Sequence, residues 1–173
     1  MLRRFASLFV LLASPLAAQS REVTLLDYKA PVPSTWTDRK PSSSSRLAEF
    51  VVAESPAGTA EVVVYFFGAQ QKPNVEANLT RWRGQFSNPD STPVAEYVTR
   101  DSSGAFPLTF AQYKGTYRRG IGAGSADSVK TGQALIASIV ETPKGVMFIQ
   151  LFGAAARVDA EKDTFMRFVK AIR

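Results

Sequence analysis

The chain of 173 residues contains no cysteine and no histidine. Without cysteine it has no disulfide, so its stability has to come from a hydrophobic core. Without either residue it has no Ser-His-Asp or Cys-His nucleophile system and no zinc site of the usual His/Cys type. We therefore expect a protein that is not an enzyme and that uses no cofactor and no metal. An enzyme of the hydrolase type, using carboxylates or a serine at a surface pocket, is the alternative.

The chain also lacks an apolar run long enough to cross a membrane. Its longest candidate lies in the first twenty residues, where Ser14-Pro15 interrupts the run well short of the roughly 20 residues that a spanning helix needs. Arg3 and Arg4, the apolar residues 5–12 and the small-x-small sequence Ala18-Gln19-Ser20 are instead typical of a secretory signal peptide. We predict cleavage after Ser20, with Ala18 as the second choice, and export by the Sec route rather than the Tat route.

No charge of one sign dominates the chain. It has 21 basic and 15 acidic residues, and removal of Arg3 and Arg4 would leave 19 basic residues, a net charge of +4. This charge is too mild and too evenly spread to indicate a nucleic-acid partner. The 45% hydrophobic content is enough for one compact domain. We therefore predict a signal peptide at 1–20 and a single domain at 21–173, a monomer with no transmembrane segment, in the periplasm or secreted.

An amphipathic helix is the clearest element that the sequence predicts. Val75, Leu79, Trp82 and Phe86 recur at spacings of four, three and four, which places them on one face of a helix over 75–86. Asn74 is a suitable N-cap, and Glu76 favours the first turn. The run AEVVVYFF, residues 60–67, precedes this helix and has the composition of a strand that is buried on both faces.

The remaining pattern predicts a mostly antiparallel sheet with a second helix. One hairpin is expected from 47–53 and 60–67, and another from 133–141 and 146–153. Further strands are expected at 23–28, 94–100 and 108–117, with Trp36 in a loop as a cover over one end of the core. A helix over 157–172 would bury Val158, Phe165, Phe168, Val169 and Ile172. The predicted fold class is α+β, an α-β-α sandwich whose sheet has about six strands.

Several segments carry a resemblance to known proteins. They are SSSSRLAEFVV, EVVVYFFG, VEANLTRWRGQF, KGTY, ALIASIVETPKG, FIQLFG and FMRFVKAIR, and together they span nearly all of the chain after residue 20. With them the chain resembles a group of uncharacterised exported bacterial proteins and, more distantly, the PsbP-type fold. That fold is an α-β-α sandwich shared by extrinsic photosystem subunits and a Ran-binding nuclear protein. The resemblance implies a fold and carries no catalytic motif across.

The candidate functional residues are polar. Asn74, Asn78, Arg81 and Gln85 form a stripe at the margin of the predicted helix face, where they can bind a ligand or satisfy backbone groups nearby. Basic residues gather around the segment 118–132, for which we expect a long mobile loop; they are Lys114, Arg118, Arg119 and Lys130. We expect the stripe and this loop to border one surface. The predicted ligand or partner surface is Asn78, Arg81, Gln85, Arg118, Arg119 and Lys130.

Two other patterns give weaker indications of function. The glycines of residues 120–124, GIGAG, lack the following helix that a phosphate-binding loop needs, so a flexible loop is the better interpretation. Four glutamates lie on or beside predicted strands, Glu49, Glu54, Glu61 and Glu141, and nothing in the sequence pairs them for acid–base chemistry. The predicted function is therefore that of a non-catalytic binding or accessory module of the cell envelope, whose partner is an envelope protein or a small ligand.

Overall fold

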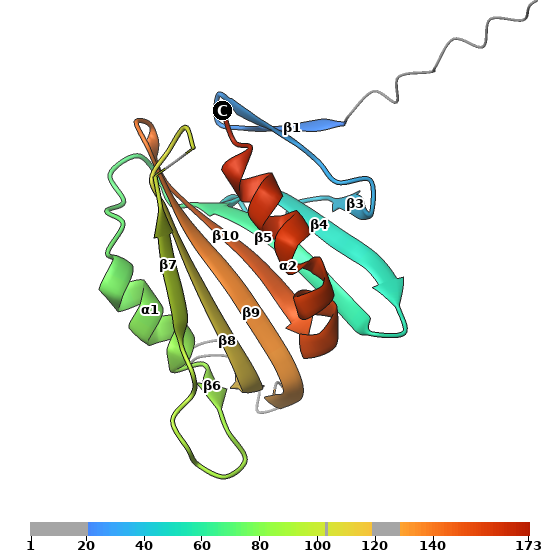
Figure 1. The fold of residues 1–173 in the computed structure, drawn as a ribbon. Helices are drawn as coiled ribbons and strands as arrows, with labels where there is room; N and C mark the ends of the chain where they lie inside the picture. The colour runs from blue at the N-terminus through green and yellow to red at the C-terminus, as the bar shows by residue number, and fades with distance from the viewer. Residues whose placement is uncertain (1–20, 103, 119–128) are drawn as a thin grey trace, which may run out of the picture.

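The computed structural model describes residues 21–102, 104–118 and 129–173. The predicted signal peptide at 1–20, the candidate residue Arg119 and the glycines of 120–124 lie outside the described residues. Within the described ranges, the chain forms a small two-stranded sheet, a large sheet and two helices (Figure 1).

The large sheet has eight strands, all paired antiparallel. They are β3 (Trp36–Arg39), β4 (Arg46–Ser55), β5 (Gly58–Phe66), β6 (Phe86–Ser87), β7 (Tyr97–Asp101), β8 (Leu108–Arg118), β9 (Val129–Thr142) and β10 (Gly145–Ala154). Their order across the sheet is β3-β4-β5-β10-β9-β8-β6, and β7 also pairs with β8. The α+β class and both predicted hairpins are confirmed. The predicted number of about six strands is wrong, because β3 and β6 are too short to show an alternating pattern.

The first predicted strand is also two strands. β1 (Glu22–Leu25) and β2 (Tyr28–Pro31) form a tight hairpin in which Leu26 adopts a positive φ of 58°. A leucine in this conformation is uncommon, so no turn residue marked the reversal in the sequence. The hairpin is tied to the C-terminus, since the backbone N–H groups of Lys29 and Arg173 donate to each other's carbonyl oxygens at 2.9 and 3.1 Å.

Helix α1 (Val75–Arg83) is shorter than the predicted 75–86. It ends at Gly84, and Phe86 starts β6, although its side chain still packs in one cluster with Leu79 and Trp82. Asn74 occupies the N-cap position, but it has a left-handed backbone and its side chain makes no capping hydrogen bond. The prediction of a side-chain cap is therefore wrong.

Helix α2 (Ala155–Lys170) covers the opposite face of the sheet, and its predicted apolar residues are all buried. Trp36 is also buried, as predicted for a cover over the core, but it begins β3 and does not lie in a loop, so that part of the prediction is wrong. Its indole N–H donates to Glu161 Oε1 of α2 at 2.7 Å, and its ring contacts Phe50 and Phe168. This hydrogen bond fixes one edge of the sheet to the helix that lies across the sheet's centre.

The two faces of the sheet are covered to different extents (Figure 1). On one face α2 contacts β9, β10 and β5, and the β1–β2 hairpin adds Leu25, Ala30 and Val32 to the same core. On the other face α1 contacts β8 and packs over a second, smaller core. The prediction that residues 62–67 are covered on both sides holds for the buried residues 62–64 only. Tyr65 is half-buried and the side chain of Phe67 is 56% exposed.

No helix within the described ranges is both long enough and apolar enough to pass through a lipid bilayer.

Trp82 is the side chain that holds α1 on the sheet, since it is only 1% exposed within the smaller core. We expect Trp82→Ala to lower the free energy of unfolding by about 3 to 5 kcal/mol, because it deletes a large buried aromatic and leaves a cavity. Urea unfolding of the residues 21–173 measures this loss. Tyr97→Ala is the control, because Tyr97 is 69% exposed and its loss should change stability by less than about 1 kcal/mol. A loss for Trp82→Ala as small as that of the control would contradict this packing.

Candidate functional site

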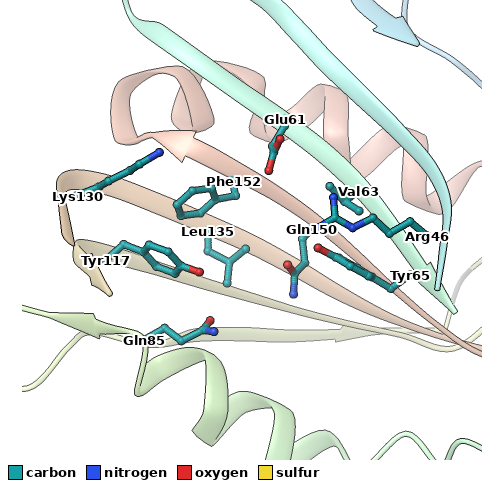
Figure 2. Close-up of a pocket in the computed structure, with 10 residues that line it drawn as sticks. All are labelled: Arg46, Glu61, Val63, Tyr65, Gln85, Tyr117, Lys130, Leu135, Gln150 and Phe152. Atoms are coloured by element: carbon teal, nitrogen blue, oxygen red, sulfur yellow. The ribbon is translucent and has the colours of Figure 1, made fainter. Parts of the chain in front are cut away.

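A groove opens on the α1 face of the sheet, beside the helix, over strands that α1 does not cover (Figure 2). Its volume is about 210 Å³. It is lined by Arg46, Glu61, Val63, Tyr65, Gln85, Tyr117, Lys130, Leu135, Gln150 and Phe152. We call these ten residues the groove.

The floor of the groove is apolar and belongs to the sheet. Val63 of β5 and Leu135 of β9 are 3% and 2% exposed, and both line the groove. Phe152 of β10 is half-buried, and its ring centroid lies 4.5 Å from that of Tyr117. The floor is therefore made of regular strands, which hold it more rigidly than a loop would.

Neutral polar groups surround this floor. The amides of Gln85 and Gln150 and the hydroxyls of Tyr65 and Tyr117 point into the space over Leu135 (Figure 2). Burial raises the pKa of Tyr65 above its usual value of 10, so this hydroxyl is protonated at neutral pH. An apolar floor with a few convergent polar groups is the usual composition of a small-molecule site.

Gln150 is the least expected of these residues. It lies on β10, in the middle of the sheet, inside the otherwise apolar run VMFIQLF. Its backbone neighbours in register are Val63 and Ala137. The half-buried amide has no hydrogen-bond partner among the described residues. Half-buried polar groups normally have partners, so this amide is available to a ligand.

An ion-pair network borders the groove on β3, β4 and β5. Glu49, only 2% exposed, accepts hydrogen bonds from Arg39 Nε and Arg46 Nη1, both at 2.9 Å. It also accepts from the backbone N–H and the hydroxyl of Ser42, at 2.7 and 2.9 Å. Arg39 reaches on to Glu61 on the next strand. The guanidinium of Arg46 lies 5.3 Å from the ring centroid of Tyr65, so the network also fixes one wall of the groove.

The pKa of Glu49 reflects this network. Burial alone would raise it, but the hydrogen bonds from the Ser42 backbone, Arg46, the Ser42 hydroxyl and Arg39 outweigh burial and lower the pKa from 4.5 to about 2. Glu49 is therefore an ionised structural group at neutral pH. Such a low pKa does not suit a group that exchanges a proton with a ligand at neutral pH. Glu61 forms an ion pair with Arg39.

Lys130 stands at the end of the groove nearest to Tyr117 (Figure 2). Its ammonium is exposed and is paired with no carboxylate of the described residues. A change of register puts it there. Gly115 pairs with Gln133 but Tyr117 pairs with Lys130, and Gly132 between them has a φ of +63°. This bulge turns Lys130 onto the face that carries Leu135, which strict alternation along the strand would not do.

A second hollow of about 230 Å³ continues from the groove toward the edge strand β3. The two hollows share Glu61, Lys130 and Phe152. The accessible surface is therefore longer than the groove alone and runs across the strands from α1 toward Arg39.

The candidate residues predicted from the sequence separate into two groups. Gln85 and Lys130 line the groove together. Arg118 is exposed at the end of β8, and its backbone N–H donates to the carbonyl oxygen of Gln85 at 2.8 Å. Asn78 and Arg81 do not line the groove. The Asn78 amide donates to the carbonyl oxygens of Pro73 and Asn74, and Arg81 donates to the Asn78 side chain, so both brace the first turns of α1.

Residues 119–128 of the expected loop at 118–132 lie outside the described residues. The two ends of the expected loop are strand, because Arg118 belongs to β8, residues 129–132 belong to β9, and Arg118 pairs with Val129. The groove residues that sequence reasoning missed are Arg46, Val63, Tyr65, Tyr117, Leu135, Gln150 and Phe152. Only Gln150 carried a signal, as a polar residue inside an apolar strand. No group of three or more acidic side chains that could hold a metal ion occurs within the described ranges.

Comparison with known proteins identifies the fold. No family model matches the chain, and no curated protein matches it. The solution structure of cyanobacterial PsbP (CyanoP) from Synechocystis sp. PCC 6803 matches with a TM-score of 0.54 and 13% identity, over 94% of this chain and 96% of that one. LpqN of Mycobacterium tuberculosis, described as involved in cell envelope biogenesis, matches with a TM-score of 0.45 and 16% identity, over 83% and 78% of the chains. The chain has a PsbP-like fold.

The Glu49 network makes stability depend on pH in acid. Between about pH 2 and pH 4.5 the unfolded chain binds more protons at Glu49 than the folded protein does, so stability falls as the pH falls through this window. The difference in pKa corresponds to about 3 kcal/mol, which is fully present above about pH 5.5. We expect Glu49→Gln to be destabilised at pH 7 and to approach the wild-type free energy of unfolding near pH 2. Urea unfolding across this pH range measures both proteins.

Glu54→Gln is the matched control for this experiment. Glu54 lies on the same strand, is exposed and has no ion pair among the described residues. Its substitution should leave the slope of stability against pH unchanged. If the slope of Glu49→Gln equalled that of the wild type, the low pKa of Glu49 would be wrong.

Proposed function

We propose that the protein is an exported binding module of the cell envelope, and that the groove is its ligand site. The observation that carries the proposal is the amide of Gln150, which opens from the central strand onto an apolar floor without a partner among the described residues. Natural proteins place a polar residue in an otherwise apolar central strand mainly at functional sites. In a purely structural sheet this position would favour an apolar residue.

The size of the groove supports a small ligand rather than a folded protein partner. A volume of about 210 Å³ lies below the 300 to 1,000 Å³ range of drug-sized sites. The ligand would therefore be a single ring or a short chain. The second hollow leaves room for an extension toward Arg39.

The electrostatics support binding rather than catalysis. Glu49 and Glu61, the carboxylates nearest the groove, are both held by Arg39. A general acid or base needs a pKa near the working pH, whereas Glu49 has a pKa of about 2. The hydrolase alternative thus gains no support from these two groups.

Export rests on the first twenty residues, with Arg3 and Arg4 before an apolar core and a small-x-small site ending at Ser20. The proposed mature protein begins at Arg21, whose guanidinium donates to Asp38 Oδ2 and to the carbonyl oxygen of Trp36, both at 2.5 Å. The proposed domain thus makes ordered contacts from its first residue.

The ligand site is tested with Gln150→Leu. This change removes the amide and fills the floor with an apolar side chain of similar volume, so the domain should stay folded. Nuclear magnetic resonance titration with a set of small aromatic fragments should shift the backbone amide signals of Leu135 and Gln150 in the wild type. In Gln150→Leu the affinity measured from these shifts should fall at least about tenfold, because the hydrogen bond between the amide and the ligand is lost.

Gln112→Leu is the matched control for the titration. Gln112 is half-buried on the other face of the same sheet, where it accepts a hydrogen bond from Lys162 at 3.1 Å. The control should bind the fragments as the wild type does. Fragments that perturb only residues outside the groove, or that bind Gln150→Leu as well as they bind the wild type, would overturn the proposed site.

Export is tested by mass spectrometry of the full chain expressed in a bacterium with a periplasm. We expect the protein in the periplasmic fraction, with the mass of residues 21–173. A chain that lacks residues 1–20 should stay in the cytoplasmic fraction. Recovery of the full chain with its first twenty residues still attached would contradict cleavage after Ser20.

A further inference from the structure

We infer that the ligand of the groove is a small aromatic monocarboxylate, held by Lys130 at its anionic end and by Gln150 at its other end. This inference rests on the proposed function and adds the charge and shape of the ligand. It follows from the charges that line the groove, from the shape of its floor and from the positions of Lys130 and Gln150.

The charge balance leaves one positive charge unmatched. Arg46 is neutralised by Glu49, and Arg39 lies between Glu49 and Glu61. These three ion pairs involve two arginines and two glutamates, so their net charge is zero. Lys130 is the remaining charged residue of the groove and no carboxylate of the described residues pairs with it. A ligand with one negative charge would complete the balance.

A doubly charged anion fits this site less well. Glu61, whose side chain is 39% exposed, lines both the groove and the second hollow together with Lys130. A phosphate monoester would bring two negative charges close to this carboxylate with a single ammonium to bind them, and like charges repel. A carboxylate brings one charge, which the ammonium matches.

The shape of the floor determines the body of the ligand. Leu135 presents buried aliphatic surface between the rings of Tyr65 and Tyr117, and Val63 lies beside Tyr65 (Figure 2). An aromatic ring can lie on this surface and meet the edges of the tyrosines. Figure 2 shows Lys130 at one end of the groove, and Gln150 with Tyr65 toward the other. A hydroxyl opposite the carboxylate would therefore meet the Gln150 amide, which can donate and accept.

The experiment compares two probes that differ in charge and little in shape, 4-hydroxybenzoate and 4-hydroxybenzamide. Each probe is titrated into a protein that consists of residues 21–173 at pH 7, and binding is followed by nuclear magnetic resonance from the backbone amide signals of the groove residues. We expect 4-hydroxybenzoate to bind about fivefold more tightly, the effect of one solvent-accessible ion pair. Raising the salt concentration from 0.05 to 0.5 M should remove most of this preference.

Substitutions of Lys130 identify the group responsible. Lys130→Gln should abolish the preference for the carboxylate and leave the affinity for the amide unchanged, whereas Lys130→Arg should keep the preference. Both variants should fold, because the side chain is exposed. Lys29→Gln is the control, since Lys29 is an exposed residue of β2, in the hairpin that packs on the α2 face. It should not change the binding of either probe.

The outcomes separate this inference from the proposed function. If both probes bind in the groove with equal affinity, or the amide binds more tightly, the charge selectivity is wrong and the ligand site stands. If the preference survives in Lys130→Gln, Lys130 is not the anion-binding group. If neither probe nor any fragment of the earlier set perturbs the groove, both the inference and the ligand site are overturned.

Discussion

A sheet of eight strands is wider than one helix can cover, and this mismatch shapes the whole molecule. Seven strands in sequence across the sheet, at about 4.8 Å apart, span about 30 Å, whereas a helix with its side chains is only about 10 to 12 Å wide. On one face, the β1–β2 hairpin and Trp36 cover what α2 leaves open. On the other face nothing within the described residues extends α1 in this way, so the groove lies open there, over residues of β4, β5, β8, β9 and β10.

The composition of the open face follows from this constraint. Exposed apolar strands would be prone to association, so the outer strands β3 to β5 carry charges on this side instead. Their carboxylates and guanidinium groups neutralise one another around the buried Glu49. Closer to α1, half-buried aromatic rings replace charges, as with Tyr65, Tyr117 and Phe152. The groove lies at the boundary between the charged region and the aromatic region, which gives it an apolar floor and a polar border.

The sequence predicted those parts of the fold that depend on regular periodicity. The apolar spacing of α2 and the two long hairpins appear where expected, because each buries a continuous stripe or strand. The structure departs from the prediction where a single residue changes the direction of the chain or of a side chain. Leu26 reverses the chain with a positive φ, Gly84 ends α1 before Phe86, and Gly132 turns Lys130 to the opposite face. The groove combines residues from β4, β5, β8, β9 and β10, a combination that only the strand order creates.

The same network that stabilises the open face limits what its groove can do. Three groups near the groove have shifted pKa values, and all three shifts lead away from neutrality. The pKa of Glu49 is lowered to about 2, and those of Tyr65 and Arg39 are raised. None of the three changes its protonation between about pH 5 and pH 9, so the polar border built on them presents constant donors and acceptors over this range. Constant groups on rigid strands favour recognition, whereas acid–base catalysis needs a group that can exchange a proton. The charge network thus supports the binding role that we propose for this face.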